Sequence, residues 1–456
     1  MTTSEIMPQL PQSILIIGGG VFGLSTALSL SHRYPTHNIT LLEASTTIPN
    51  PEGSSVDSSR IVRADYANPA YARLAAAGIE RWRTTAWGAE GRYTQNGLVL
   101  VYHKSSSGEA GRQGQDDGER YTRASYQNVK RLVNNGDDKI VQFLPDRDAI
   151  QKVLPRDVHV AESVAAGYVN WGSGWADAEA GVRYARKKLD ELGVVKIRTG
   201  QKVSRLLFAD QKDRREVTGV QLADGSTLTA DLVILATGAW TPGLLDLRGL
   251  ADARGQVLAY LRLTDEEQAK LAQMPTLLSF STGMFIIPPR NNELKIARHA
   301  YGYRNPTRVR FDSSGAEEAE VSLPETAGRP IPPEGEEACR AALREMLPWL
   351  ADRPFTKTRV CWYTDTPQGD FLVTYHPDHP NLFLATGGSG HAYKFFPVLG
   401  DKIVDALEGK LEEDLQRLWR WPAQRTTTTS FVTKDGSRSG RKDMILKEEY
   451  ARGLKL

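Results

Sequence analysis

The stretch from Ser13 to Glu43 constrains the fold of this 456-residue chain more than any other. Its first residues, Ser13 to Ile17, are apolar and rich in β-branched side chains, which is typical of a buried strand. Glycines follow at once, and residues 24–34 then have the apolar spacing of a helix. A second strand is predicted at residues 39–42. This order predicts a βαβ unit, and hence an α/β fold.

The glycines between the first strand and the helix follow the pattern Gly-x-Gly-x-x-Gly. The first glycine permits a tight turn, the second lets the backbone approach a pyrophosphate, and the third lets the helix pack close to the strand. The N-terminus of the helix offers free N–H groups to phosphates, and an acid about 20 residues later can accept hydrogen bonds from ribose hydroxyls. A dinucleotide is therefore predicted, with a glycine-rich turn in another α/β unit as the alternative. The residues concerned are Gly18, Gly20, Val21, Phe22, Gly23 and Glu43.

Two more junctions of strand and glycine lie later in the chain, at Asp231 to Trp240 and at Asn381 to Gly388. A nicotinamide dehydrogenase usually needs one such fold made of contiguous sequence. A flavin domain of the glutathione-reductase type is instead interrupted by insertions and returns to the dinucleotide late. The late junction, which continues to Gly390, therefore favours FAD over NAD.

Composition excludes several classes of partner. The chain has 57 Lys and Arg against 55 Asp and Glu, so the net charge of +2 gives no reason to expect nucleic acid or an acidic membrane surface. Two cysteines argue against a disulfide framework. No run approaches the roughly 20 apolar residues of a membrane helix, and no metal site is predicted. The terminal Leu454-Lys455-Leu456 loosely resembles a peroxisomal signal, so the expected location is the cytoplasm or the peroxisome.

The remaining chain divides into segments of different character. Residues 104–120 are polar and glycine-rich and are expected to form a mobile surface loop, and residues 423–441 are expected to be loosely held. Strands of a second sheet are predicted near residues 257–263, 284–288 and 294–297. The predicted domains are an FAD-binding domain from 1–97, 161–250 and 359–421, a substrate domain with a mixed sheet from 98–160 and 251–358, and a polar C-terminal tail from 422–456.

Four motifs carry a resemblance to a known family. They are Cys361-Trp362-Tyr363-Thr364-Asp365-Thr366-Pro367, Ser389-Gly390-His391-Ala392-Tyr393-Lys394, Ser59-Arg60-Ile61-Val62-Arg63 and Gly238-Ala239-Trp240. Together these motifs resemble the monomeric sarcosine oxidase and fructosyl amino acid oxidase branch of the D-amino-acid-oxidase-like flavoproteins. The resemblance implies a glutathione-reductase-type FAD-binding Rossmann domain interleaved with an α+β substrate domain, in a monomeric enzyme.

The resemblance changes how two residues are interpreted. A lone cysteine such as Cys361 inside an apolar segment is usually inert core, but the matching cysteine of the family carries FAD through a thioether to the 8α carbon. Lys295 alternates with Leu294 and Ile296, which alone suggests a strand with one solvated face. By resemblance it is the lysine over the flavin that activates oxygen, since a fixed cation stabilises superoxide where water is excluded.

The family match also implies a substrate site. Arg63 and Lys394 match positions that grip a carboxylate, while the alternative for Arg63 is a surface ion pair with Asp65. His299 and Tyr363 match positions that face the substrate, although either alone would more often be a packed residue. His391, near the flavin, either contributes directly or only positions its loop. The further residues that the resemblance assigns to the cofactor are Ser59, Arg60, Val203, Gly238, Trp240, Cys361, Gly388, Gly390, His391 and Lys394.

One departure bears on the substrate. Sarcosine oxidases carry a histidine a few residues before the first arginine of Arg-x-x-Arg, where this chain has Val56-Asp57-Ser58-Ser59, and fructosyl amino acid oxidases usually lack the two arginines. The segment looks more like fungal saccharopine and pipecolate oxidases and a fungal alkaloid-pathway amine oxidase. The expected activity is oxidation of secondary amines of amino acid type by FAD and O2, giving an imine that is hydrolysed or trapped internally, and H2O2. The alternatives are a dehydrogenase with another acceptor and a flavin-binding protein without turnover.

Overall fold

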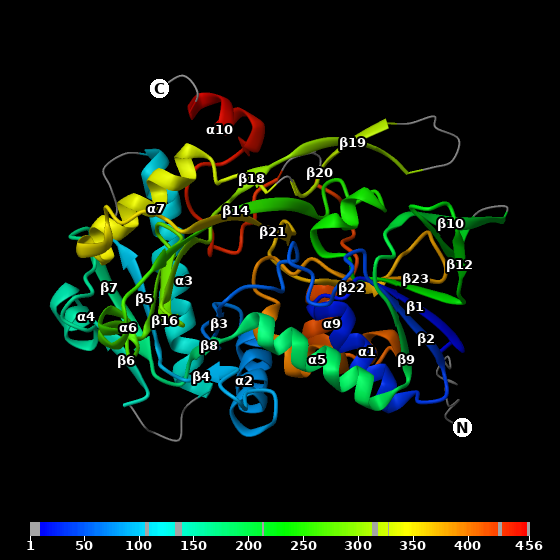
Figure 1. Cartoon of the computed structure of the whole chain (residues 1–456), viewed down its shortest axis with the longest axis horizontal. Coiled ribbons are helices and arrows are strands. Elements are labelled where there is room, and N and C mark those ends of the chain that lie inside the picture. The colour runs from blue at the N-terminus through cyan, green and yellow to red at the C-terminus, as the bar shows by residue number, and fades with distance from the viewer. Residues whose placement is uncertain are drawn as a thin grey trace.

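The computed structural model of the chain describes residues 10–104, 109–132, 139–211, 214–311, 318–326, 328–426 and 431–453. Its strands form two large sheets, which lie at the right and at the left of Figure 1. The helices in the described residues are α1 (Val21–Arg33), α2 (Pro69–Thr84), α3 (Glu109–Leu132), α4 (Arg147–Val153), α5 (Ala178–Leu192), α6 (Asp265–Leu271), α7 (Pro333–Met346), α8 (Phe396–Leu407), α9 (Glu413–Trp419) and α10 (Leu446–Gly453), with short 3-10 turns η1 (Gly238–Gly243), η2 (Pro348–Leu350) and η3 (Tyr393–Phe395).

The sheet at the right of Figure 1 is the one predicted from the glycine motif. Within the described residues it has six strands, β1 (Ser13–Ile17), β2 (Asn38–Leu42), β9 (Val195–Arg198), β13 (Leu232–Leu235), β22 (Leu372–Tyr375) and β23 (Leu382–Thr386). Their order is β22-β23-β13-β1-β2-β9, and all neighbours are parallel except β22 and β23. The three predicted junctions of strand and glycine, after β1, β13 and β23, thus meet at one edge of this sheet.

Strand β1 is buried on both faces because its sheet is covered on both sides. Ile14 and Ile16 belong to the core shared with Leu24 of α1, whereas Leu15 and Ile17 belong to a separate core on the opposite face. That second core includes a small sheet of β10 (Val203–Gln211), β11 (Arg214–Leu222) and β12 (Thr227–Thr229). Since side chains alternate along a strand, a strand between two cores needs an unbroken apolar run.

The sheet at the left of Figure 1 is mixed, as predicted. Its ten described strands are β5 (Leu98–His103), β6 (Val141–Leu144), β7 (Val164–Asn170), β14 (Asp252–Arg262), β15 (Thr276–Ser279), β16 (Met284–Arg290), β17 (Glu293–Arg298), β18 (Tyr303–Arg304), β21 (Lys357–Asp365) and β24 (Met444–Ile445). The long strand β14 pairs with both β17 and β21. Strands β7 and β21 lie in this sheet although the predicted division placed their residues with the FAD domain, and the domain boundaries stay a prediction.

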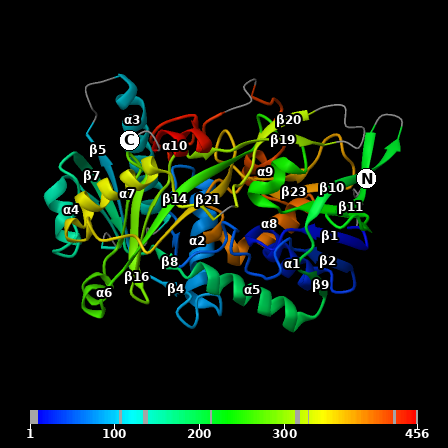
Figure 2. The same cartoon turned by 45° about the horizontal axis from the view of Figure 1, so that its top comes forward.

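Small elements link the two sheets. A sheet of β3 (Arg60–Val62), β4 (Tyr93–Thr94) and β8 (Gly174–Ala176) carries the predicted Ser59 to Arg63 motif, and β19 (Pro306–Arg310) pairs with β20 (Glu318–Ser322). In Figure 2, α7 and α10 lie together above the mixed sheet that contains β14. The two sheets and their covering helices therefore agree with the expected α/β fold.

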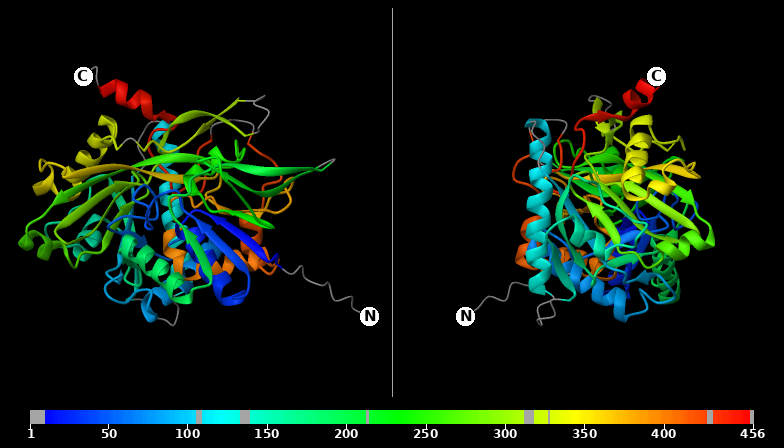
Figure 3. Two further views of the ribbon diagram at one scale, coloured as in Figure 1. Left: turned by 45° about the vertical axis from the view of Figure 1, so that its right-hand side comes forward. Right: turned by 90° about the vertical axis from the view of Figure 1, so that its left-hand side faces the viewer.

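Residues 104–120 are not a loop throughout, so this prediction is wrong from Glu109 onward. Helix α3 begins there and runs along one side of the molecule, as the right-hand view of Figure 3 shows. Residues 105–108 lie outside the described part. Tyr121, Thr122, Ser125 and Val129 of this helix are buried, and Tyr121 packs against Phe280. Tertiary packing of one face therefore outweighs the glycines that suggested a loop.

Part of the C-terminal region is more buried than predicted. The prediction of a loosely held segment at 423–441 is wrong for residues 431–441, because Phe431, Thr433, Ser437, Arg438 and Ser439 are buried. Leu454-Lys455-Leu456 lies outside the described residues, and peroxisomal import stays a prediction. None of the helices in the described part combines the length and hydropathy that a bilayer span requires.

Candidate active site

A cavity of about 870 Å³ opens where the parallel strands β1, β2, β13 and β23 end. This is within the range of cofactor and small-molecule sites, roughly 300–1,000 Å³, and at the edge where α/β sheets bind ligands. Many residues predicted to bind a dinucleotide line it: Gly18, Gly20, Val21, Phe22, Glu43, Arg60, Val203, Gly238, Trp240, Gly388, Gly390 and His391. Gly23, Ser59, Cys361 and Lys394 do not line this cavity.

Glycine is required at two of these turns. Gly18 has φ of 109°, and a Cβ there would lie 2.5 Å from the Ala236 carbonyl oxygen. A Cβ on Gly23 would lie 1.8 Å from the Gly18 carbonyl oxygen, so Gly23 allows α1 to approach β1. Gly20, the N-cap of α1, provides no side-chain cap. The first turn of α1 therefore presents its backbone toward the cavity.

Glu43, at the end of β2, is buried and joins the two sides of the turn. Its Oε2 accepts a hydrogen bond from the Gly19 N–H at 2.8 Å. Its Oε1 accepts from the Ser45 N–H at 2.8 Å and from Asn50 Nδ2 at 2.9 Å. A carboxylate has about four acceptor positions, so Glu43 can also accept from a ribose hydroxyl.

A second, smaller cavity of about 70 Å³ adjoins the first. Arg60, Tyr363, Gly390, His391 and Tyr393 line both. The small cavity is also lined by Cys361 and by all residues predicted to be catalytic, namely Lys295, Arg63, Lys394, His299 and Tyr363. The fold thus brings together side chains from β17, β21, η3 and the end of β3.

Arg63 and Lys394 are buried cations without a carboxylate partner among the described residues. Arg63 is 5% exposed, its Nη1 has no hydrogen-bond partner in the described part of the chain, and its guanidinium lies over the rings of Tyr66 and Phe280. Lys394 donates to the Tyr66 hydroxyl at 2.9 Å and to the His391 carbonyl at 2.8 Å. Burial and the nearby Arg63 lower the pKa of Lys394 well below its usual value.

The alternative of a surface ion pair between Arg63 and Asp65 is wrong. Asp65 is fully buried and accepts hydrogen bonds from Tyr168, Asn170 and Ser173 instead. Its carboxylate is therefore satisfied by neutral donors rather than by an ion pair with Arg63. The guanidinium remains available to a carboxylate from outside the chain.

Lys295 is 2% exposed, so the strand with one solvated face is likewise wrong. Strand β17 lies between β14 and β16, with both faces covered. The ammonium donates to Asp57 Oδ2 at 3.0 Å and to the Ser59 carbonyl. Burial lowers the pKa of Lys295 to about 8, although Asp57 opposes that shift.

Asp57 is a site residue to which the sequence analysis gave no role. Its carboxylate accepts from Lys295, from Arg60 and, at 2.7 Å, from the Tyr260 hydroxyl. Burial opposes its ionisation, but Arg60 and Lys295 outweigh burial and hold its pKa below the usual range. The available signal was an acid three residues before Arg60, at the position where the resemblance broke down.

Cys361 lies on β21, opposite Gln256 of β14, with a free thiol that is 1% exposed. The Nη2 of Arg60 lies 3.5 Å from its Sγ. Cys361 faces the small cavity, whereas the other free cysteine, Cys339, is buried in α7. The chain therefore places one thiol where the two cavities meet.

The family model of FAD dependent oxidoreductases, known as DAO, matches residues 13–406. An amino acid oxidase of Aspergillus flavus, imqH, is 34% identical over 90% of this chain and 98% of its own length.

The chain belongs to the DAO family of FAD-dependent oxidoreductases.

Other relatives agree with this assignment. L-saccharopine oxidase of Schizosaccharomyces pombe is 29% identical over 90% of this chain and 93% of its own length. The crystal structure of fructosamine oxidase from Aspergillus fumigatus, Amadoriase II, in complex with FSA is similar with a TM-score of 0.78 and 26% identity, covering 95% of each chain. The predicted class, an FAD-dependent amine or amino acid oxidase, and the predicted FAD-binding fold are confirmed.

The residues present fit FAD. The large cavity has the glycine turns in which a side chain would collide with backbone, a buried acid at the end of β2 and a helix start whose N-cap, Gly20, has no side chain. Gly388, after β23, adds a second close approach, because a Cβ there would lie 3.1 Å from the Phe22 ring. Backbone N–H groups and a carboxylate suit a pyrophosphate and a ribose.

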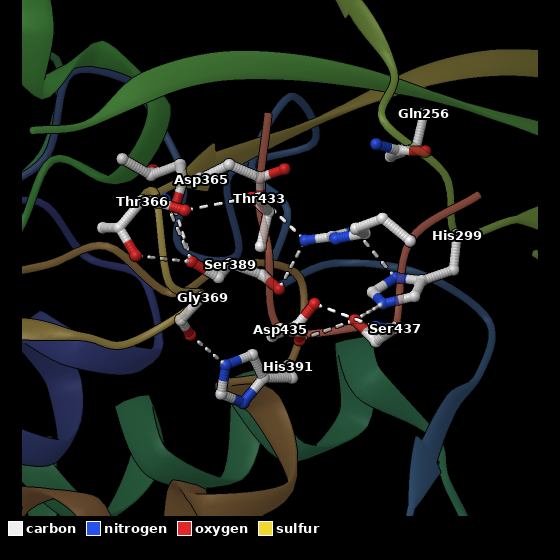
Figure 4. A network of polar contacts seen from close by, with 12 residues as sticks. Gln256, His299, Asp365, Thr366, Gly369, Ser389, His391, Thr433, Asp435 and Ser437 are labelled. Carbon is white, nitrogen blue, oxygen red and sulfur yellow. Dashed lines mark hydrogen bonds and ion pairs between the residues drawn. The ribbon is translucent and has the colours of Figure 1, made fainter. Parts of the chain in front are cut away.

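The other predicted residues hold their surroundings in place. Ser59 reaches the site through its carbonyl, which accepts from Lys295. His391 donates from Nε2 to the Gly369 carbonyl at 2.8 Å and accepts at Nδ1 from the Tyr66 hydroxyl at 3.0 Å, and the first of these bonds is drawn in Figure 4. His299 and Tyr363 have ring centroids 5.8 Å apart. All of these residues lie at or beside the junction of the cavities.

Arg438 is a second residue that the sequence analysis missed. It is 1% exposed and donates to Asp365 Oδ1 at 2.8 Å, to the Ser389 carbonyl at 2.9 Å and to His299 Nδ1 at 3.0 Å. It lies in a polar stretch with no apolar period, so no local pattern marks it. Only the folded chain brings it beside residues 139 positions earlier.

Proposed function

We propose that the protein oxidises secondary amines of the amino acid type, such as N-methyl or N-alkyl amino acids, to imines and reduces O2 to H2O2. The observation that supports this most is the pair of buried cations, Arg63 and Lys394, at a small cavity that adjoins the glycine-lined one. A substrate carboxylate neutralises them and accepts a hydrogen bond from the unpartnered Arg63 Nη1. The amine end of the substrate then points toward the wall shared by the cavities.

The cations also prepare the amine. Arg63 supplies a planar fork that fixes the orientation of the carboxylate, and Lys394 adds a point charge held by Tyr66. Positive charge and burial lower the pKa of an amine bound nearby, so the substrate loses its proton on binding. No side chain of the chain then needs to act as a base.

The chemistry that FAD would supply when bound is acceptance of a hydride equivalent from the carbon beside the amine nitrogen and transfer of those electrons to O2. Lys295 provides a fixed positive charge where oxygen takes up these electrons, and Asp57 and the Ser59 carbonyl hold its ammonium in place. Rings such as Phe285 and Phe280 wall the small cavity and exclude water. Exclusion of water strengthens the effect of the charge.

We further propose that FAD is attached to Cys361 through a thioether at its 8α carbon. The support is a buried free thiol at the junction of the cavities, with a guanidinium 3.5 Å away. The chain is proposed to act as a monomer in the cytoplasm or the peroxisome, and the imine is either hydrolysed or trapped by intramolecular bond formation.

The test is a panel of amines scored for peroxide with the purified, yellow holoenzyme. The panel contains sarcosine, N-methyl aromatic amino acids, pipecolate, saccharopine and a fructosyl amino acid. Peroxide formation with at least one N-alkyl amino acid, and none with the same amine after conversion of its carboxylate to an amide, is the expected result. Turnover with a dye but without oxygen uptake would instead indicate a dehydrogenase, and no flavin bleaching under anaerobic conditions would indicate a protein without turnover.

A further inference from the structure

Residues 431–445 form a C-terminal segment that packs behind His299, one of the residues that line the small cavity. Its anchors are spread along its length: the Thr433 hydroxyl donates to the Thr366 carbonyl at 3.0 Å, and the Lys434 N–H donates to the Pro367 carbonyl at 2.9 Å. The Ser439 carbonyl accepts from the Tyr301 N–H at 3.1 Å. The segment is thus fixed to the chain after both β21 and β17, which carry Cys361 and Lys295.

Within this segment, Arg438 determines the protonation of His299. An arginine side chain can only donate hydrogen bonds. Since Arg438 Nη1 lies 3.0 Å from His299 Nδ1, that ring nitrogen must be the acceptor and carry no hydrogen. Asp365 and the Ser389 carbonyl hold the same guanidinium from the other side.

The other ring nitrogen of His299 is also engaged. Figure 4 shows the His299 ring beside Ser437, whose hydroxyl lies 3.3 Å from Nε2. The Ser437 hydroxyl donates to Asp435 Oδ2 at 2.6 Å, so its oxygen is free to accept from the Nε2 hydrogen. His299 is therefore neutral, with its hydrogen on Nε2 and no lone pair left to take a proton from a substrate.

The surroundings of His299 add to this effect. Its ring lies near the rings of Tyr363 and Phe280, and burial is the main cause that lowers the pKa of His299 well below its usual value. The charged and titratable groups that face it and lower the pKa further are Arg438, Arg63, His391 and Lys394. Arg438 is the member of this set that contacts the ring directly.

We propose that Arg438 is a positioning residue of the substrate pocket, which acts through His299 by fixing its orientation and its neutral, Nε2-protonated form. The C-terminal segment is thereby part of the active site. Because His299 cannot accept a proton, its ring is an uncharged part of the pocket lining beside the amine. The effect on turnover rests on the proposed amine oxidation, whereas the state of the ring does not.

The state of the ring is tested by NMR of the holoenzyme with ¹⁵N-labelled imidazoles. The chain has eight histidines, and the resonance that disappears in His299→Asn identifies His299. The expected spectrum shows one protonated and one unprotonated nitrogen that do not titrate between about pH 5 and pH 9. A His299 ring that titrates in this range in the unsubstituted protein overturns the proposal, whatever the enzyme oxidises.

The contribution of Arg438 is tested by the pH dependence of kcat/KM. Burial raises the pKa of Asp365 to about 6, so this group is first removed by Asp365→Asn, which serves as the reference. Adding Arg438→Met should free Nδ1 and raise the pKa of His299 toward, but not up to, the ordinary histidine value of about 6.5, because burial remains. The expected kcat/KM then falls about tenfold for each pH unit below that ionisation, whereas the Asp365→Asn reference shows no such acid limb.

A third substitution separates the proposed role from general damage. Adding His299→Asn to the double variant should remove the acid limb while leaving the other losses in place. An acid limb that persists without His299, or a double variant with the same profile as Asp365→Asn, overturns the proposal. Circular dichroism and thermal unfolding show whether each variant is folded, and the NMR measurement on the unsubstituted protein needs no Arg438 variant.

Discussion

The two adjoining cavities differ in what builds them. The shape of the large cavity depends on the backbone, because a Cβ atom at Gly18 or Gly23 would collide with a neighbouring carbonyl oxygen. The small cavity depends on buried charged side chains, Arg63, Lys295 and Lys394, which come from separate parts of the chain. Turns whose backbone N–H groups bind phosphates occur in many enzymes, whereas a particular arrangement of buried charges is specific for one kind of substrate. In the proposed function, cofactor binding therefore depends on residues close in sequence, and substrate recognition on residues far apart in sequence.

The largest expected effect concerns the Cys361 thiol, which lines the small cavity beside Arg60. Cys361→Ser should release all flavin from the protein on acid denaturation, whereas the unsubstituted protein keeps it, because a hydroxyl cannot form the proposed thioether. The absorbance of the precipitate and of the supernatant gives the result. Cys339→Ser is the matched control, since that cysteine is buried in α7 away from both cavities. Flavin retained without Cys361 would contradict the attachment.

The next effect tests whether the small cavity works through its charges. Arg63→Met and Lys394→Met should each lower kcat/KM for an amino-acid-type amine by about 100- to 1,000-fold, because one partner of a buried ion pair is lost. Flavin content should not change. Lys187→Met, on the exposed face of α5, is the control for removal of a lysine charge. Equal losses for the amine whose carboxylate is replaced by an amide would argue against a carboxylate grip.

Lys295 should affect only the step with oxygen. Lys295→Met should slow reoxidation of the reduced enzyme by about 100-fold, the cost of losing one fixed charge at a reacting centre. With a pKa of about 8, the ammonium form predominates below that pH and is lost above it. Reoxidation of the unsubstituted enzyme should therefore fall as pH rises through about 8, and the rate in Lys295→Met should be independent of pH. Stopped-flow absorbance measures both, and a pH-dependent rate in the variant would assign the ionisation elsewhere.

The smallest expected effect tests the large cavity, whose shape depends on the backbone. Glu43→Gln in the Cys361→Ser background should weaken FAD binding only about five- to tenfold, since it replaces one ionised acceptor at a site held mostly by backbone. Fluorescence titration of the apoprotein with FAD measures the change. Asp231→Asn, at the far end of the same sheet, is a suitable control. A loss above about 1,000-fold would mean that the carboxylate, rather than the glycine turns, dominates binding.

The difference between the cavities also explains what could be predicted from the sequence. Strand β1, the glycine turn and α1 follow each other in 21 residues, from Ser13 to Arg33, and their pattern is local. The buried state of Lys295 does not follow from its residue pattern, because alternation along a strand does not reveal that both faces are covered. Arg438 was missed because its partner His299 lies 139 residues away. Asp57 was missed although Arg60 is only three residues away, because its other partner, Lys295, lies 238 residues away. The family resemblance, rather than residue pattern, brought Lys295 and Cys361 into the site.

Strand β14 has a consequence for protein engineering. It pairs Tyr260 with Lys295 on one side and Gln256 with Cys361 on the other, so a single strand sets the spacing between the ammonium and the thiol. One inserted or deleted residue between positions 256 and 260 would turn one of the two partners to the wrong face of the sheet. Libraries that aim at new amines should therefore leave the length of β14 untouched.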